Sequence, residues 1–178
     1  MTFSYQRILT AIDRSAQASA IFAQSCALAQ QTQAQWQIAH CIPGSQQEDR
    51  IAQASAMELD LSLMLWESQQ QQHHHQEAEA QHWLQEYGQQ AKALDLHPHL
   101  CTGLGNPGPW LCQLAQDWQA DLIIIGRRGH QTVQELLFGS VSSYVVHHAP
   151  CCVLVVQGTQ TVGETASLAT AAAGSACA

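Results

Sequence analysis

Two glycine-containing segments in the second half of the chain have the residue types that bind a phosphate. Gly126, Arg127 and Gly129 directly follow an apolar run, and Gly139 and Ser140 come after nine intervening residues. Glycine has no Cβ, so the backbone N–H groups beside it can approach an anion closely, and the serine hydroxyl is a further donor. The helix expected to follow would add unpaired N–H groups and the positive end of its dipole. This pattern predicts an anion-binding loop that needs no lysine.

The same glycines also have a purely structural interpretation, in which they form two turns and the cap of a helix. Short glycine patterns often occur without a ligand, so the glycines alone do not decide between the two interpretations. Two other phosphate-binding motifs are missing from the sequence. It contains neither the GK[ST] of a Walker P-loop nor a GxGxxG after its first apolar run.

An acidic side chain ends the first apolar run of the sequence. Asp13 follows residues 7–12 and precedes Ser15, which is a candidate helix N-cap. An aspartate at such a place often caps the next turn or helix. It can also contact a ligand directly, or hold Mg²⁺ through water beside a phosphate.

The histidines and cysteines are weaker candidates for a metal site or a nucleophile. His73, His74 and His75 are adjacent, so on a helix they would point in different directions, and the Gln-rich run around them indicates a solvated segment. Cys151 and Cys152 would lie on opposite sides of a strand, and the apolar residues after them favour the core. A nucleophilic cysteine needs a base and a low pKa, and the sequence identifies no such base.

Five apolar runs predict buried strands, and helical segments separate them. The strands are expected at residues 7–12, 35–42, 97–102, 121–125 and 151–156. The helices are expected at residues 19–33, 109–118, 131–137 and 141–148, with one more helix on each side of the Gln-His run at 69–76. Strands that alternate with helices form right-handed crossovers and a parallel sheet. The expected fold class is therefore α/β, a doubly wound five-stranded parallel sheet with helices on both faces.

Length, charge and cysteine count limit the organisation and the partners. The 178 residues suit one domain over residues 1–157 and a flexible tail over 158–178. A net charge of −8 with six Lys and Arg argues against a nucleic-acid or membrane partner. The sequence has no apolar run near the roughly 20 residues that span a bilayer, no signal-peptide pattern, and seven cysteines without a CxxC spacing. We therefore expect a cytoplasmic protein with reduced thiols.

The glycine spacing, taken with its surroundings, resembles a known family. Gly126-x2-Gly129-x9-Gly139-Ser140 is similar to the G-2x-G-9x-G-[S/T] nucleotide signature of ATP-binding universal stress proteins. ILTAIDRSAQAS resembles that family's first strand and its Asp-containing loop, and the Gly-Asn-Pro at 105–107 resembles its loop after the third strand. ADLIIIGRRG and HHAPCCVLVV resemble its fourth strand and its final segment, so the resemblance covers roughly residues 5–156.

This resemblance implies a Rossmann-type domain, of the adenine nucleotide alpha-hydrolase-like kind, that binds ATP, with or without Mg²⁺, at the carboxyl ends of its strands. It implies that Asp13 contacts the adenosine part and that the main chain of Cys41 touches adenine. The nucleotide-binding positions that it implies are Ala11, Asp13, Cys41, Gly126, Arg127, Gly129, Gly139, Ser140 and Val141. Ala11 replaces a Val or Pro of many relatives. Arg127 belongs to a basic pair, residues 127–128, that could bind the triphosphate or face solvent.

Three functions follow as alternatives. The first is a regulatory or stress-response module that binds ATP or a related adenine nucleotide. The second is a slow ATPase or phosphotransferase, ranked lower because the motif contains no convincing general base. The third is a nucleotide-free scaffold that acts through dimer contacts. The last strand, residues 151–156, would be an apolar sheet edge, which predicts a homodimer through that strand, as the resemblance also implies.

Overall fold

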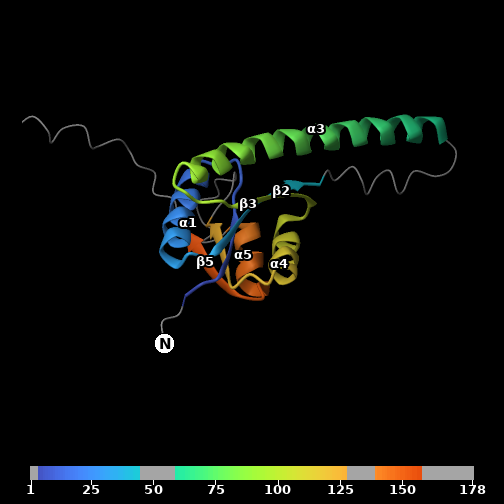
Figure 1. The fold of residues 1–178 in the computed structure, drawn as a ribbon. Helices are drawn as coiled ribbons and strands as arrows, with labels where there is room; N and C mark the ends of the chain where they lie inside the picture. Colours follow the sequence, from blue (N-terminus) through green and yellow to red (C-terminus); the bar gives the residue numbers. More distant parts are fainter. Residues whose placement is uncertain (1–3, 45–58, 128–138, 158–178) are drawn as a thin grey trace, which may run out of the picture.

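The computed structural model describes residues 4–44, 59–127 and 139–157, and its core is a single parallel sheet (Figure 1). The strands are β1 (Arg7–Ala11), β2 (Gln35–Pro43), β3 (His99–Gly105), β4 (Leu122–Gly126) and β5 (Cys152–Val156). They lie in the order β3-β2-β1-β4-β5, and every neighbouring pair is parallel. The predicted fold class, a five-stranded doubly wound α/β sheet, is thus confirmed.

Helices cover both faces of this sheet (Figure 1). They are α1 (Ala18–Thr32), α3 (Leu59–Lys92), α4 (Pro107–Asp117) and α5 (Ser140–His148). One apolar cluster joins α1 and α3 to one face of the sheet, through residues such as Ile21 and Leu84. A second cluster joins α4 and α5 to the other face, through residues such as Leu111 and Val145. Within the described ranges, no helix combines the length and apolar character that crossing a membrane requires.

Helix α3 corrects the expectation of two helices separated at the Gln-His run. The structure has one continuous helix of 34 residues that passes through residues 69–76 without a break. Glutamine and histidine are polar, but neither removes a backbone donor as proline does, so a polar run does not interrupt the helical hydrogen bonds. The buried residues Ala80, Leu84 and Ala91 of the second half pack on the sheet. The first half projects past the sheet (Figure 1).

Several predicted boundaries move by a few residues. β3 continues to Gly105, beyond the expected end at residue 102, and α4 begins at Pro107 instead of residue 109. A Cβ at Gly103 would lie 2.1 Å from the Trp110 ring, so the absence of a side chain there lets α4 pack closely on β3. The expected N-cap Ser15 is also corrected. The N-cap of α1 is Gln17, whose N–H donates to the Ser15 hydroxyl at 3.3 Å. The predicted helix at 131–137 and the predicted tail at 158–178 lie outside the described residues.

A chain of buried hydroxyl groups joins α1 to the two central strands. Trp36 Nε1 on β2 donates to Thr10 Oγ1 on β1 at 2.9 Å, and Thr10 donates to Ser25 Oγ on α1 at 2.9 Å. Ser25 in turn donates to the carbonyl of Ile21 at 2.8 Å. Thr10 and Ser25 are fully buried, so each polar atom depends on its protein partner instead of on water. These hydrogen bonds fix the position of α1 against β1, near the end of β1 that leads into the loop containing Asp13.

Replacing Thr10 by valine keeps the shape of the side chain and removes the acceptor of Trp36. We expect Thr10→Val to lower the free energy of unfolding by about 1–3 kcal/mol, because it leaves a buried N–H without a partner. Urea denaturation followed by fluorescence measures this change. Thr32→Val is the matched control, since Thr32 donates only to the carbonyl of Leu28 in its own, partly exposed helix turn. An equal loss for the two variants would contradict a special role of the buried chain.

Candidate functional site

The carboxyl ends of three neighbouring strands meet beside the first residues of α5. Ala11 is paired with Ala39 on β2 and with Ile125 on β4. Cys41 and Arg127 are each two residues past these partners, as Asp13 is two residues past Ala11. The chain leaves β1 through α1 on one face of the sheet and leaves β4 toward α5 on the other. The boundary between β1 and β4 is therefore the topological switch point, where ligands of open parallel sheets bind.

One carbonyl holds the start of α5 against the end of β4. The carbonyl of Arg127 accepts a hydrogen bond from the Gly139 N–H at 2.8 Å and another from Ser142 Oγ at 2.8 Å. Ser142 Oγ also lies 3.1 Å from the carbonyl of Gly139. The N–H of Arg127 itself donates to the carbonyl of Val156 on β5 at 2.9 Å. The structure thus brings Gly126 and Arg127 together with Gly139 and with the first residues of α5, Ser140 and Val141.

The first turn of α5 presents backbone donors at this junction. Gly139 is the N-cap, with φ −72° and ψ 164°, and it has no side chain to cap the helix. The N–H of Gly139 is bound to Arg127, so it is not available to an anion. The N–H groups of Ser140, Val141 and Ser142 are the first three of the helix, and these have no intrahelical acceptor. These N–H groups and the positive end of the α5 dipole are the features that an anion would bind, and binding there stays a prediction.

Gly126 is glycine for a packing reason that the sequence did not reveal. A Cβ at this position would lie 2.7 Å from Ile21 Cδ1 and 3.3 Å from Gln17 Oε1, both on α1. Ile21 is 2% exposed, so its methyl group has little room to move aside. The residue that was predicted to lie along the nucleotide therefore also sets the distance between α1 and β4. Gly129 lies outside the described residues.

Asp13 shapes the loop between β1 and α1. Its Oδ1 accepts hydrogen bonds from the N–H of Ser15, at 3.2 Å, and from the Ser15 hydroxyl. The capping interpretation of this aspartate is therefore correct for one carboxylate oxygen. Oδ2 takes no part in these bonds, and Asp13 is half-buried at the carboxyl edge of the sheet. A contact between Asp13 and a ligand stays a prediction.

The peptide groups of Cys41 point toward the end of β1, whereas its thiol bonds to β3. The Ile12 N–H donates to the carbonyl of Ala39 at 3.0 Å, so the peptide groups of Ala39 point toward β1. Because peptide directions repeat every second residue along a strand, those of Cys41 point the same way, past the end of β1. The thiol donates to the carbonyl of Gly105 at 3.7 Å, and burial raises its pKa to about 11. A thiol with that pKa stays protonated at neutral pH and is a poor nucleophile.

The Arg127 side chain is directed toward β5. Its Nη1 donates to Gln157 Oε1 at 3.4 Å, and the side chain is partly exposed. This guanidinium thus lies at the rim of the junction and not between the strand ends. Its backbone, through the carbonyl described above, contributes more to the geometry of the site than its charge does.

Two residues beside the site were missed in the sequence. His40 is 8% exposed, and its Nδ1 lies 2.9 Å from the carbonyl of Ile12, the residue before Asp13. A carbonyl can only accept, so Nδ1 of His40 carries the proton. The ring of Trp83 on α3 meets the His40 ring edge-on, with centroids 5.0 Å apart. For His40, the signal in the sequence was a polar residue inside the apolar run at 35–42. For Trp83 there was no signal, since nothing in the sequence indicated that α3 returns to this edge of the sheet.

The histidines at 73–75 belong to α3, and His75 Nε2 lies 3.4 Å from Glu79 Oε1. Among the residues that the structure describes, no three His, Cys, Asp or Glu side chains are grouped so that they could bind a metal ion. Cys151 is half-buried and packs against the apolar cluster on the α4 and α5 face, whereas Cys152 is exposed.

The sequence matches known proteins over nearly its whole described length. The profile of the Universal stress protein family matches residues 4–157. The chain is 37% identical over 153 residues to Universal stress protein Sll1388 of Synechocystis sp., covering 86% of this chain and 98% of that protein. It is 47% identical over 73 residues to Universal stress protein Slr1101 of the same organism, covering 41% of this chain and 68% of that protein.

Solved structures share the fold. The hypothetical protein MJ0577 superimposes with a TM-score of 0.73 at 21% identity, covering 89% of this chain and all (100%) of that one. UspA from Lactobacillus plantarum gives a TM-score of 0.67 at 24% identity, covering 87% and 99% of the two chains. A universal stress protein in complex with cAMP gives a TM-score of 0.56 at 21% identity, covering 86% and 98%. At these identities the likeness establishes the fold and not the ligand.

The packing role of Gly126 can be tested with a double-mutant cycle. We expect Gly126→Ala to lower the free energy of unfolding by about 1–3 kcal/mol, because the added methyl group overlaps with Ile21. Ile21→Val removes the Cδ1 methyl group that lies in the way. In the double variant the two costs should be less than additive by about 1 kcal/mol, measured by urea denaturation. Strict additivity would show that Ile21 is not the constraint on Gly126.

Proposed function

The chain belongs to the universal stress protein family, and on that premise we propose that it binds ATP or a related adenine nucleotide at the junction of β1, β2, β4 and α5, and acts as a regulatory or stress-response module. The observation that carries the proposal is the Arg127 carbonyl, which holds the free N–H groups of α5 beside the strand ends. A nucleotide needs both of the features that meet there, an anion site and peptide groups that can read a base.

Each part of the nucleotide has a set of residues suited to it. The peptide groups of Cys41 suit the hydrogen-bonding edge of adenine, and Asp13 suits a hydroxyl or amino group of the adenosine part. The N–H groups of Ser140 and Val141 suit the phosphates. The other predicted contacts are the backbone of Ala11, Gly126, Arg127 and Gly139, which shape the same junction, and the backbone of Gly129, which lies outside the described residues. Mg²⁺, if it accompanies the phosphates, would use their oxygens and the carboxylate of Asp13.

Solved relatives of the same fold support an adenine nucleotide as the ligand class. One structure is a universal stress protein in complex with cAMP. Another is a universal stress family protein from Arabidopsis thaliana with AMP bound, with a TM-score of 0.56 at 14% identity. The choice of ATP for this chain rests on the G-2x-G-9x-G-[S/T] spacing. Mass spectrometry of nucleotide released from the denatured, purified protein distinguishes ATP from AMP and cAMP.

Binding is favoured over catalysis by the state of the polar groups at the junction. Phosphoryl transfer needs a residue that positions or deprotonates the nucleophile. Asp13 uses Oδ1 to hold the loop, the Cys41 thiol has a pKa of about 11, and the Arg127 guanidinium bonds to Gln157. A slow ATPase remains the second candidate, and turnover by the purified protein would establish it.

We also propose a homodimer that forms through β5, in the cytoplasm. Among the strands that the structure describes, β5 is paired with β4 alone, and its Leu154 is 40% exposed. An apolar strand with one open edge tends to pair with another chain. The six cysteines of the described residues are all free thiols, as a reducing compartment would keep them. A dimer that binds no nucleotide would point to the scaffold alternative.

Replacing Ser140 by proline tests the anion site without disturbing the helix. Ser140 is the first residue of α5, where proline is favoured, and Gly139 has the extended backbone that a following proline requires. Ser140→Pro removes one phosphate-binding N–H, so we expect ATP affinity to fall about tenfold, with an unchanged free energy of unfolding. Isothermal titration calorimetry measures the affinity.

Ser140→Ala is the matched control for this variant, because it removes the hydroxyl and keeps the N–H. It should weaken ATP binding less than Ser140→Pro does. Wild-type affinity in Ser140→Pro would contradict the assignment of the phosphates to the start of α5. Failure of the wild-type chain to bind ATP, AMP or cAMP would overturn the proposed function itself.

The dimer is tested at the two edges of the sheet. Leu154→Lys places a charge on the exposed part of the edge strand β5, and we expect it to convert the dimer into a monomer at micromolar concentration. The control is Leu104→Lys on β3, the opposite edge, where Leu104 is 45% exposed. Light scattering coupled to size-exclusion chromatography measures both masses. A monomeric wild type, or a dimer that only Leu104→Lys disrupts, would refute pairing through β5.

A further inference from the structure

We propose that a second ligand site lies between the start of α1 and the middle of α3, and that it binds a small planar aromatic anion. A cavity of about 570 Å³ opens there. That volume falls within the range of small-molecule sites, about 300–1,000 Å³. Its lining combines aromatic and small apolar side chains, such as Trp83 and Ala78, with charged ones, such as Arg14 and Glu79. None of its lining residues was predicted as a nucleotide contact.

One wall of this cavity is a single stripe of α3. The residues on this wall are His75, Ala78, Glu79, His82, Trp83 and Tyr87. Their spacing by three, four and one residues puts them on one face of the helix. The stripe begins inside the Gln-His run, so the continuity of α3 through that run is what places His75 and Ala78 over the sheet edge. The facing wall consists of Arg14, Ser15 and Ala18 at the start of α1.

Trp83 lines the cavity, and the rings packed against it fix its orientation. Trp83 meets Tyr87 with ring centroids 5.2 Å apart and an interplanar angle of 79°, and it meets His40 at 5.0 Å and 66°. Both contacts are edge-to-face, the geometry that aromatic pairs favour. Trp83 therefore has a fixed orientation before any ligand arrives. A planar ligand ring can pack on it beside the Arg14 guanidinium, at little cost in the side-chain entropy of Trp83.

The polar rim favours a negative group on that ligand. The guanidinium of Arg14 lies 5.8 Å from the centre of the Trp83 ring, so it meets an aromatic face and no carboxylate of the described residues. The Glu79 carboxylate at the rim is directed at His75, at 3.4 Å. Arg14 is one of six Lys and Arg in a chain of net charge −8. An acid group beside Arg14 and a ring on Trp83 would satisfy both features of the cavity.

The proposed site is separate from the nucleotide junction but shares a loop with it. The cavity lies on the face of the sheet that α1 and α3 cover, whereas α5 and its N–H groups belong to the other face. Ser15 lines the cavity and also donates its hydroxyl to Asp13. The two ligands would therefore bind on opposite sides of one short loop, without overlapping.

Naphthalene-2-carboxylate is a suitable probe, and 2-naphthalenemethanol, which has the same ring and no charge, is its control. We expect the acid to bind the full chain more tightly than the alcohol, as measured by calorimetry without nucleotide. Arg14→Gln should weaken binding of the acid about tenfold and leave the alcohol unchanged. Arg14 is exposed, so this change does not threaten folding.

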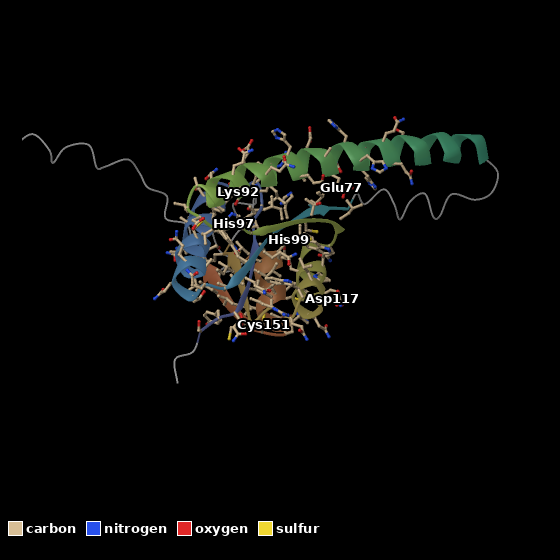
Figure 2. All side chains as sticks on the ribbon, in the orientation of Figure 1. Glu77, Lys92, His97, His99, Asp117 and Cys151 are labelled. Atoms are coloured by element: carbon tan, nitrogen blue, oxygen red, sulfur yellow. The ribbon has the colours of Figure 1, made fainter. Side chains whose placement is uncertain are left out.

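Lys92→Gln is the matched variant, because it removes one positive charge from the last turn of α3, at a residue that does not line the cavity. Figure 2 shows Lys92 near the end of α3, away from Glu77. The Lys92→Gln variant should bind the acid as the wild type does. Equal losses for Arg14→Gln and Lys92→Gln would reduce the effect to net charge and overturn the site. No binding of the acid at millimolar concentration would also overturn it. Complete displacement of the acid by ATP would show that the cavity is part of the nucleotide site, whereas joint binding supports two sites.

Discussion

The position of β1 between β2 and β4 is the constraint from which the rest of this structure follows. Ile8, Leu9 and Thr10 of this strand are fully buried, so both faces must be covered by helices and both edges must be paired. The chain leaves β1 on one face and leaves β4 toward the other. Such a boundary is where open parallel sheets bind their ligands, because the two connections diverge there. The topology therefore favours a ligand site at this place before any side chain is considered.

Many of the polar groups around this boundary serve the fold first. The Arg127 carbonyl binds Gly139 and Ser142, Asp13 holds Ser15, and the thiol of Cys41 reaches Gly105. What remains for a ligand is mainly backbone, namely the first N–H groups of α5 and the peptide groups of Cys41. Such groups do not titrate near neutral pH and need no reorganisation to bind an anion. This chemistry suits recognition of a nucleotide better than its turnover.

The long helix α3 changes the neighbourhood of the site on the other side of the β1–α1 loop. The polar Gln-His run does not end the helix, so α3 brings Trp83, Tyr87 and His82 over the start of α1. His40 hydrogen-bonds to the carbonyl of Ile12, the residue before Asp13, and the Trp83 ring packs against His40. The β1–α1 loop thus lies between two regions of different chemistry, the strand ends with the backbone donors of α5 and the cavity lined by aromatic rings.

The sequence by itself determined the order of the strands, the α/β class and the glycine pattern, because each depends on neighbours within a few residues. It also favoured the switch-point location, since parallel strands joined by crossovers leave little choice. The tertiary structure alone decided that Gly126 is small because of Ile21, that Gly139 donates to Arg127, and that α3 is unbroken. The first two contacts join residues that are far apart in the chain. The third feature depends on backbone hydrogen bonds, which any helical residue can make whatever the polarity of its side chain. For that physical reason no local pattern could have predicted them.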